Sequence, residues 1–179
     1  MKAVMKSVSP RICEKVAKGD CTILVSKTAP KCEVPFKCYI YVKKGKPYLY
    51  RVDDDDNFEL INALRSKVYW YVKDYNEQNG KVIGEFVCDK VFLLHPYTYD
   101  GGNADLRHRK LIQTFEGSSK GNEILAATCL TQDEMFDYIG AGNYGYGWHI
   151  SDLKTYGNPK ELSEFGLTRP PQSWCYIES

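Results

Sequence analysis

The pattern of apolar and polar positions predicts a chain built mainly of short strands. Apolar side chains alternate with polar ones in several stretches, and a period of two is typical of a strand with one buried face. The alternation is clearest over residues 36–43, where Phe36 and Ile40 share one face and Lys37 lies on the other. Strands are predicted over residues 3–8, 21–26, 36–43, 47–52, 80–94, 146–156 and 174–177.

Start and stop signals predict short helices between these strands. Ser9 as N-cap, followed by Pro10, opens the first helix, and Gly19 ends it. Thr131 and Glu134 form a capping box that opens a second helix. Two further short helices are predicted over residues 58–64 and 158–166.

The order of these elements predicts an α+β fold. Strands follow one another mostly without long helical crossovers, so we expect a mixed, barrel-like sheet flanked by short helices. Residues 95–122 are polar, rich in glycine and poorly periodic, and we expect them to form an excursion from the core. No repeat or linker divides the sequence, which predicts a single domain over residues 1–179.

The charge balance excludes one class of nucleic-acid binder. The 179 residues include 24 Lys and Arg against 23 Asp and Glu, a formal charge of +1, which is unlike a strongly basic protein of the histone type. No apolar run reaches the roughly 18 residues of a membrane span. The start, Met1–Lys6, also lacks the apolar stretch of a signal peptide. We therefore expect a cytoplasmic location without membrane association.

The cysteines do not follow the spacing of a metal site. There are seven, an odd number, with no CxxC pair, and none of the three histidines lies at the spacing of a zinc finger. Without a secretory signal, a disulfide framework is not expected either. We expect free, buried thiols and neither a metal nor a cofactor.

Two local patterns are open to a functional interpretation. Residues 140–145 match the letters GxGxxG, but a dinucleotide site needs a strand before this motif and a helix after it, and here the predicted order is reversed. We interpret the stretch as a turn. The polar face of the 36–43 strand carries Lys37, Tyr39, Tyr41 and Lys43. Such a face is typical either of a platform for single-stranded nucleic acid or of an ordinary solvated strand.

Five segments together point to a family. They are Ser7-Val8-Ser9-Pro10, Lys18-Gly19 with the following Thr22 to Lys27, Val82-Ile83-Gly84-Glu85-Phe86, Trp148-His149-Ile150-Ser151-Asp152-Leu153 and Arg169-Pro170-Pro171-Gln172-Ser173-Trp174. In order and spacing they resemble the ASCH domain of bacterial and phage proteins, which belongs to the PUA-like group of small β-barrels. The resemblance covers nearly the whole chain outside residues 95–122 and implies a PUA-like mixed barrel with a cleft beside the first helix.

The resemblance also implies a ligand, namely RNA or a modified nucleoside. Cations near the first helix would attract phosphate, together with the helix N-terminus, and side chains near residue 148 would stack on a base or form hydrogen bonds to it. The RNA-binding residues expected on this basis are Arg11, Thr22, Lys27, Lys31, Tyr144, Trp148 and His149.

The sequence departs from the catalytic members of the family. Some relatives are amidohydrolases that use the lysine and the threonine of a G-x-K-x-x-T stretch with a distant glutamate. Here Cys21 and Leu24 stand at the first two positions, so the ammonium and the hydroxyl are missing. Glu85 is a candidate for the glutamate. Where relatives commonly carry charged residues, this chain also has Ser9 and Ser26, and fewer cations weaken the attraction for phosphate.

Three hypotheses follow from the sequence. The leading one is a non-catalytic PUA-like module that binds RNA or a nucleotide-like ligand in a cleft beside the first helix. The alternative is a hydrolase of a modified nucleoside or RNA with a divergent active site, in which Cys21 is the nucleophile if its pKa is lowered. A third is a module that binds another protein through a surface rich in tyrosine, of which the chain has fourteen.

Overall fold

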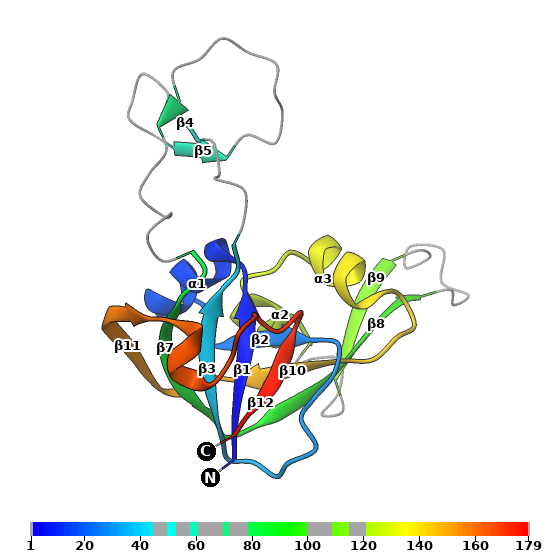
Figure 1. Ribbon diagram of the computed structural model, residues 1–179. Coiled ribbons are helices and arrows are strands. Elements are labelled where there is room, and N and C mark those ends of the chain that lie inside the picture. Colours follow the sequence, from blue (N-terminus) through cyan, green and yellow to red (C-terminus); the bar gives the residue numbers. More distant parts are fainter. Residues whose placement is uncertain are drawn as a thin grey trace.

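Two β-sheets packed face to face form the body of the structure (Figure 1). The computed structural model describes residues 2–44, 50–52, 58–60, 70–71, 79–99, 109–114 and 121–178. The first sheet has the strand order β11-β7-β3-β1-β12. Its strands are β1 (Ala3–Val8), β3 (Phe36–Val42), β7 (Val82–Cys88), β11 (Ser151–Lys160) and β12 (Trp174–Ile177).

The second sheet has the order β2-β10-β8-β9. Its strands are β2 (Ile23–Ser26), β8 (Val91–Tyr99), β9 (Arg109–Thr114) and β10 (Gly145–His149). A separate small sheet consists of β4 (Tyr50–Val52), β5 (Phe58–Leu60) and β6 (Trp70–Tyr71). The helices are α1 (Pro10–Ala17), α2 (Gly121–Ala127), α3 (Gln132–Ile139) and the 3₁₀ turn η3 (Leu162–Phe165).

The main core lies between the two sheets because strand alternation sends one set of side chains inward. On β1, Val4 and Val8 are buried in the same cluster as Phe36 of β3 and Trp148 of β10. The rings of Phe36 and Trp148 meet edge to face, with centroids 5.5 Å apart. A burial of this kind contributes most of the stability of a small domain.

The other face of the first sheet is covered by the chain that follows β11. Met5 and Tyr41 pack there with Leu162, Phe165 and Leu167. Tyr41 is only 1% exposed. The face of the 36–43 strand that carries Tyr39 and Tyr41 is therefore neither a solvated surface nor an open platform for nucleic acid, because the C-terminal segment packs on it.

Sharp corners carry the chain from one sheet to the other. The strand predicted over 80–94 is two strands, since Asp89 and Lys90 lie between β7 of the first sheet and β8 of the second. A second corner at Ile150 separates β10 from β11, and Asp152 just after it has a positive φ of 48°. The described residues thus form an α+β fold as predicted, but hydrogen bonds do not join their two sheets into the closed barrel that we expected.

Two other predictions need correction. Within the expected excursion at 95–122, β8 continues to Tyr99 and β9 pairs with it, so both strands are part of the second sheet. The periodic signal is weak because Ile112 is the only aliphatic side chain of β9 that is buried. Residues 58–60 of the predicted helix 58–64 form strand β5, and the rest of that segment lies outside the described residues.

The two ends of the described chain lie together at one end of the molecule (Figure 1). Strand β12 pairs antiparallel with β1, and Ala3 lies opposite Ile177. No helix in the described part of the chain is long and apolar enough to cross a membrane. In the same residues, no three His, Cys, Asp or Glu side chains gather in a way that would hold a metal ion.

Candidate functional site

A cleft of about 240 Å³ opens beside the N-terminal end of α1. It lies between the end of β1, strand β2, helix α3 and the segment that leads into β12. The side chains that line it are mostly small or polar around an aliphatic wall: Lys6, Ser7, Val8, Ser9, Ile12, Ile23, Leu24, Val25, Lys43, Thr128, Leu130, Glu134, Tyr138 and Ser173.

A buried lysine is part of the wall of this cleft. Lys6 lies between Val4 and Val8 on the inward face of β1, where a strand with one buried face ordinarily carries apolar side chains. It is 3% exposed, and its Nζ lies 4.5 Å from the centroid of the Trp148 ring. Among the described residues, no carboxylate forms an ion pair with it.

Burial lowers the pKa of Lys6 to about 8, because an ammonium group loses hydration in the interior. The nearby charge of Lys43 lowers the pKa further, while Cys38 opposes the shift. The ammonium form still predominates at pH 7. The cleft therefore holds a positive charge that is stabilised by an aromatic face rather than by a counterion.

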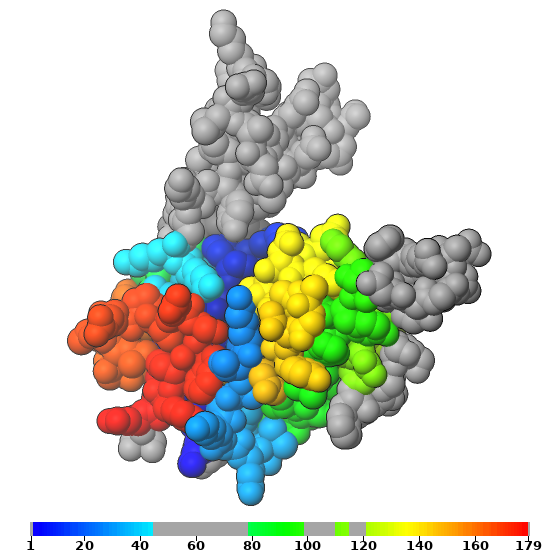
Figure 2. Space-filling model, turned by 90° about the vertical axis from the view of Figure 1, so that its right-hand side faces the viewer, coloured from blue at the N-terminus to red at the C-terminus, as the bar shows by residue number. Residues whose placement is uncertain are grey.

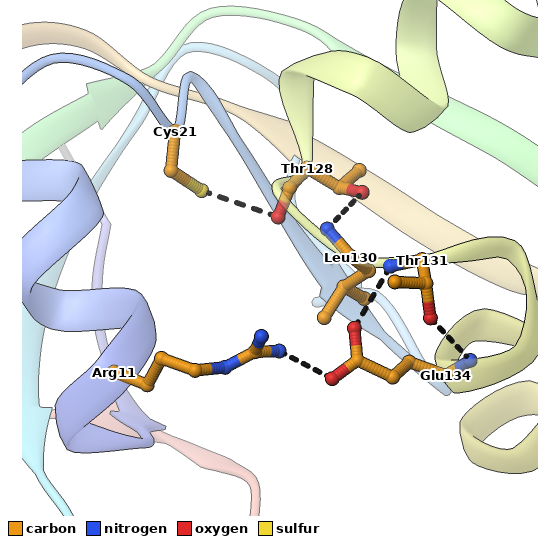
Figure 3. Close-up of polar contacts among 6 residues, drawn as sticks. All are labelled: Arg11, Cys21, Thr128, Leu130, Thr131 and Glu134. Carbon is orange, nitrogen blue, oxygen red and sulfur yellow. Dashed lines mark hydrogen bonds and ion pairs between the residues drawn. The ribbon is translucent and has the colours of Figure 1, made fainter. Parts of the chain in front are cut away.

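An ion pair joins α1 to Glu134 of α3, which lines the cleft (Figure 3). Arg11 Nη2 donates to Glu134 Oε1 at 2.5 Å. Glu134 also completes the capping box of α3, because its Oε2 accepts from the Thr131 N–H at 2.8 Å and the Thr131 hydroxyl accepts from the Glu134 N–H. Among the described residues, Lys6 and Lys43 are the two cations that line the cleft, and its one lining carboxylate, Glu134, is paired with Arg11.

A second hollow of about 500 Å³ brings together three of the residues predicted from the sequence. Lys27, Lys31 and Tyr144 all line it, and its other lining residues are Thr28, Ala29, Tyr146, Trp174 and Tyr176. Figure 2 shows the blue segment after β2 between α3, in yellow, and the red C-terminal segment. Lys27 Nζ lies 5.4 Å from the ring centroid of Tyr138, which lines the cleft, so Lys27 links the two depressions.

The structure separates the remaining predicted residues from this surface. Trp148 is fully buried, so its ring packs on Lys6 and Phe36 and offers no free face for a base. His149 lies at a corner between the sheets, where its Nδ1 is 2.6 Å from Asp89 Oδ1. Thr22 is exposed, and its backbone carbonyl accepts from the Ile150 N–H; it lines neither the cleft nor the second hollow. The Arg11 side chain forms an ion pair with Glu134.

The residues at the family's catalytic positions do not form a reactive group here. Cys21 is 1% exposed, and burial raises the pKa of its thiol to about 12. The thiol donates to the Thr128 carbonyl at 3.5 Å (Figure 3). The lowered pKa that a cysteine nucleophile requires is therefore not present. Leu24 is a buried apolar part of the cleft wall.

Glu85 lies on another part of the molecule. Its Oε2 accepts from the Tyr156 hydroxyl at 2.7 Å and its Oε1 from Lys37 Nζ at 3.0 Å. Burial alone would raise the pKa of Glu85, but these two hydrogen bonds lower it overall. It lines neither the cleft nor the second hollow.

The sequence did not indicate Lys6 or Ser173 as residues of the cleft, and it indicated Lys43 only as part of the polar face of the 36–43 strand. One local signal was available for Lys6, because a lysine that alternates with Val4 and Val8 breaks the apolar face of a strand. Ser173 had no such signal. It reaches the cleft only because β12 returns to pair with β1.

The fold is similar to that of solved proteins. The crystal structure of ASCH from Zymomonas mobilis matches with a TM-score of 0.58 at 13% identity, and the match covers 99% of this chain and 88% of that one. Two single-substitution variants of the same Zymomonas mobilis protein match with TM-scores of 0.59 and 0.58, both at 12% identity. No protein-family model and no curated protein sequence matches. The likeness shows the fold: the chain is folded like the ASCH protein of Zymomonas mobilis, which agrees with the segments that suggested the ASCH domain.

Proposed function

We propose that this protein is a non-catalytic module that binds RNA or a nucleotide-like ligand in the cleft beside α1. The observation that supports this best is the buried, unpaired ammonium of Lys6 in the cleft wall. A charge held away from water is unfavourable unless something compensates it, and an anionic ligand would do so. Lys43 at the same cleft adds a second cation.

The surface around the cleft fits a ligand longer than one nucleotide. The second hollow adjoins the cleft through Lys27 and Tyr138, and it combines two lysines with four aromatic side chains. Aromatic planes next to cations are typical of surfaces that bind single-stranded nucleic acid. On its other side, a third hollow of about 710 Å³ shares Ser7 and Lys43 with the cleft.

The hydrolase alternative is less well supported. It depended on Cys21 as a nucleophile, and burial keeps this thiol protonated at neutral pH. The cleft instead offers cations and hydroxyl groups, which bind an anion without any chemical step.

Filter binding to a mixed pool of short single-stranded RNA, measured across a salt series, tests the proposal. We expect affinity to fall as salt rises, because bound cations displace counterions. Lys43→Ala should weaken binding and reduce the slope of log K against log salt by about 0.7, the value for one contact to a single strand. Lys154→Ala, which removes an exposed lysine on β11, is the matched control and should bind like the wild type. Binding that is absent, or equal in Lys43→Ala and wild type, would contradict the proposal.

A further inference from the structure

The cleft contains features that distinguish between two ways in which a nucleotide could enter it. A base requires an exposed aromatic plane and hydrogen-bonding groups for its edge. A phosphate requires cations, hydroxyl groups and free N–H donors. The side chains of the cleft can be compared with each of these requirements.

The aromatic requirement is poorly met within the cleft. Tyr138 is the one aromatic side chain among its described lining residues, and it is 36% exposed. The Trp148 ring has Lys6 over its face and is fully buried. The two most exposed aromatic side chains of the described residues, Tyr144 and Tyr176, line the neighbouring hollow together with the half-buried Trp174.

The requirements for an anion are met by groups from two elements. Lys6 is more than nine-tenths buried, lines the cleft and has no carboxylate partner among the described residues. Helix α1 begins at the same cleft, since Ser9 and Ile12 both line it. The Ser9 side chain makes no capping hydrogen bond, so it leaves the N–H groups of the first turn to another acceptor.

The size of the cleft limits how much of a nucleotide can enter it. The cleft measures about 240 Å³, which is below the roughly 300–1,000 Å³ of sites that enclose a whole drug-sized ligand. It fits one part of a nucleotide. The carboxylate of Glu134 is the one acidic group among the lining residues that the structure describes, and Arg11 neutralises it.

We propose that the cleft holds a phosphate group, between the Lys6 ammonium and the N-terminus of α1, while the base of the same or the next nucleotide lies outside on the aromatic hollow. The ligand class is thus a nucleoside monophosphate or the phosphorylated end of an RNA strand. This inference rests on the proposed function and specifies the orientation of the ligand.

Calorimetric titration with the four nucleosides, their 5′- and 3′-monophosphates and inorganic phosphate tests the orientation. We expect at least one monophosphate to bind about tenfold or more tightly than its nucleoside, because a hydrogen bond to a charged group is stronger than a neutral one. Inorganic phosphate should compete with that monophosphate. In Lys6→Met, which keeps an unbranched side chain that is one atom shorter but removes its charge, the preference for the monophosphate should disappear. The control Lys154→Met should retain it.

A second measurement keeps the test independent of any effect of Lys6→Met on folding. The ε-methylene NMR signal of Lys6 in the wild type reports its ionisation, and a bound phosphate should raise the Lys6 pKa. Nucleosides that bind as tightly as their monophosphates, or an unchanged Lys6 pKa with monophosphate bound, would overturn the orientation and leave the proposed function standing. Failure of every nucleotide and of the RNA pool to bind would refute both.

Discussion

At the scale of single residues, Lys6 shows a conflict between stability and the proposed function. An ammonium between two sheets is an unfavourable choice for folding, since an apolar side chain of the same length would fill the same space without losing hydration. Its retention at an inward position of β1 is understandable if a ligand supplies the missing anion. Residues that lower stability at a binding site are common in proteins.

The first prediction concerns the stability of Lys6→Met. The folded pKa of Lys6 is about 8 against an ordinary 10.5, so the unfolded chain binds more protons between these two values. Stability attributable to this residue therefore rises with pH over that window and is lowest below pH 8. We expect Lys6→Met to be more stable than wild type at pH 7 by about 1–3 kcal/mol, and the gap to narrow toward pH 10.5.

Urea unfolding of both proteins between pH 6 and 10.5 measures this difference. Comparing the two proteins also cancels the effect of buried thiols that do not interact with Lys6, such as Cys13 and Cys88. Burial raises the pKa of each of these thiols to about 12, so their contribution to stability falls as the pH rises. A variant that is less stable than wild type at pH 7, or a gap that is independent of pH, would show that the Lys6 ammonium is not desolvated.

At the scale of elements, one carboxylate performs two tasks at the start of α3. Glu134 completes the capping box with Thr131 and also pairs with Arg11 on α1. The pair is more than one third exposed on both sides, so the surrounding water screens it. The cap should therefore matter more for stability than the ion pair.

The second prediction separates these two contributions. Thr131→Ala should lower the free energy of unfolding by about 1 kcal/mol, the usual effect of losing an N-cap. Arg11→Ala should lower it by about 0.5 kcal/mol or less. Glu134→Gln is the informative control, because glutamine can still close the capping box while the charge is lost, and it should resemble Arg11→Ala. If Arg11→Ala were the more harmful change in urea unfolding, the ion pair would be the main link between α1 and α3.

The elements also show which parts of the secondary structure could be predicted from the sequence alone. Helix signals located α1 and α3 because Pro10, Thr131 and Glu134 act through neighbours in the chain. The turn at 140–145 was also predicted correctly, since Gly140 ends α3 and β10 begins at Gly145. The break at Asp89 and Lys90 was missed, because a corner between two sheets depends on distant partners and leaves no period in the sequence.

At the scale of the whole molecule, His149 has a structural position that its sequence context did not reveal. It ends β10 at one corner between the sheets, and its ring meets Asp89 at the other corner. The His149 N–H also donates to the Lys90 carbonyl at 2.9 Å. The residue that was expected to contact a base thus joins the two turns that hold the sheets in place.

The third prediction concerns this link. The hydrogen bond from His149 lowers the pKa of Asp89 below its ordinary 3.8. A carboxylate with a lowered pKa stabilises the fold above that ordinary value, and the contribution is lost as the pH falls. Because both side chains are more than one third exposed, Asp89→Asn should cost no more than about 1 kcal/mol at pH 6. In acid unfolding, the difference from wild type should shrink as the pH falls below 3.8 and vanish once Asp89 is protonated in the folded protein as well.

The same position predicts a result in the binding assay. Since His149 does not line the cleft or the second hollow among the described residues, His149→Ala should bind the RNA pool with the wild-type affinity. If His149→Ala lost affinity for RNA without losing stability, His149 would be shown to contact the RNA, as the sequence predicted.

The sequence therefore led to the family fold more securely than to the site. Several separate segments resembled the family. A departure from the family pattern in one segment therefore did not conceal the resemblance of the others. The cleft, in contrast, takes Lys6 from β1, Lys43 from the end of β3 and Ser173 from the far end of the chain. Their proximity is a product of strand pairing, which no local spacing encodes.

The pairing of β12 with β1 has a consequence for how the protein is made. The Ser7 hydroxyl donates to the Pro171 carbonyl across 164 positions of sequence, and Ser173 completes the wall that Lys6 begins. A nascent chain emerging from the ribosome therefore exposes the Lys6 side chain long before the Ser173 side of the cleft has been synthesised. Until β12 is released and docks on β1, the cleft lacks this wall, so the ligand proposed above can be enclosed only after synthesis has passed residue 173.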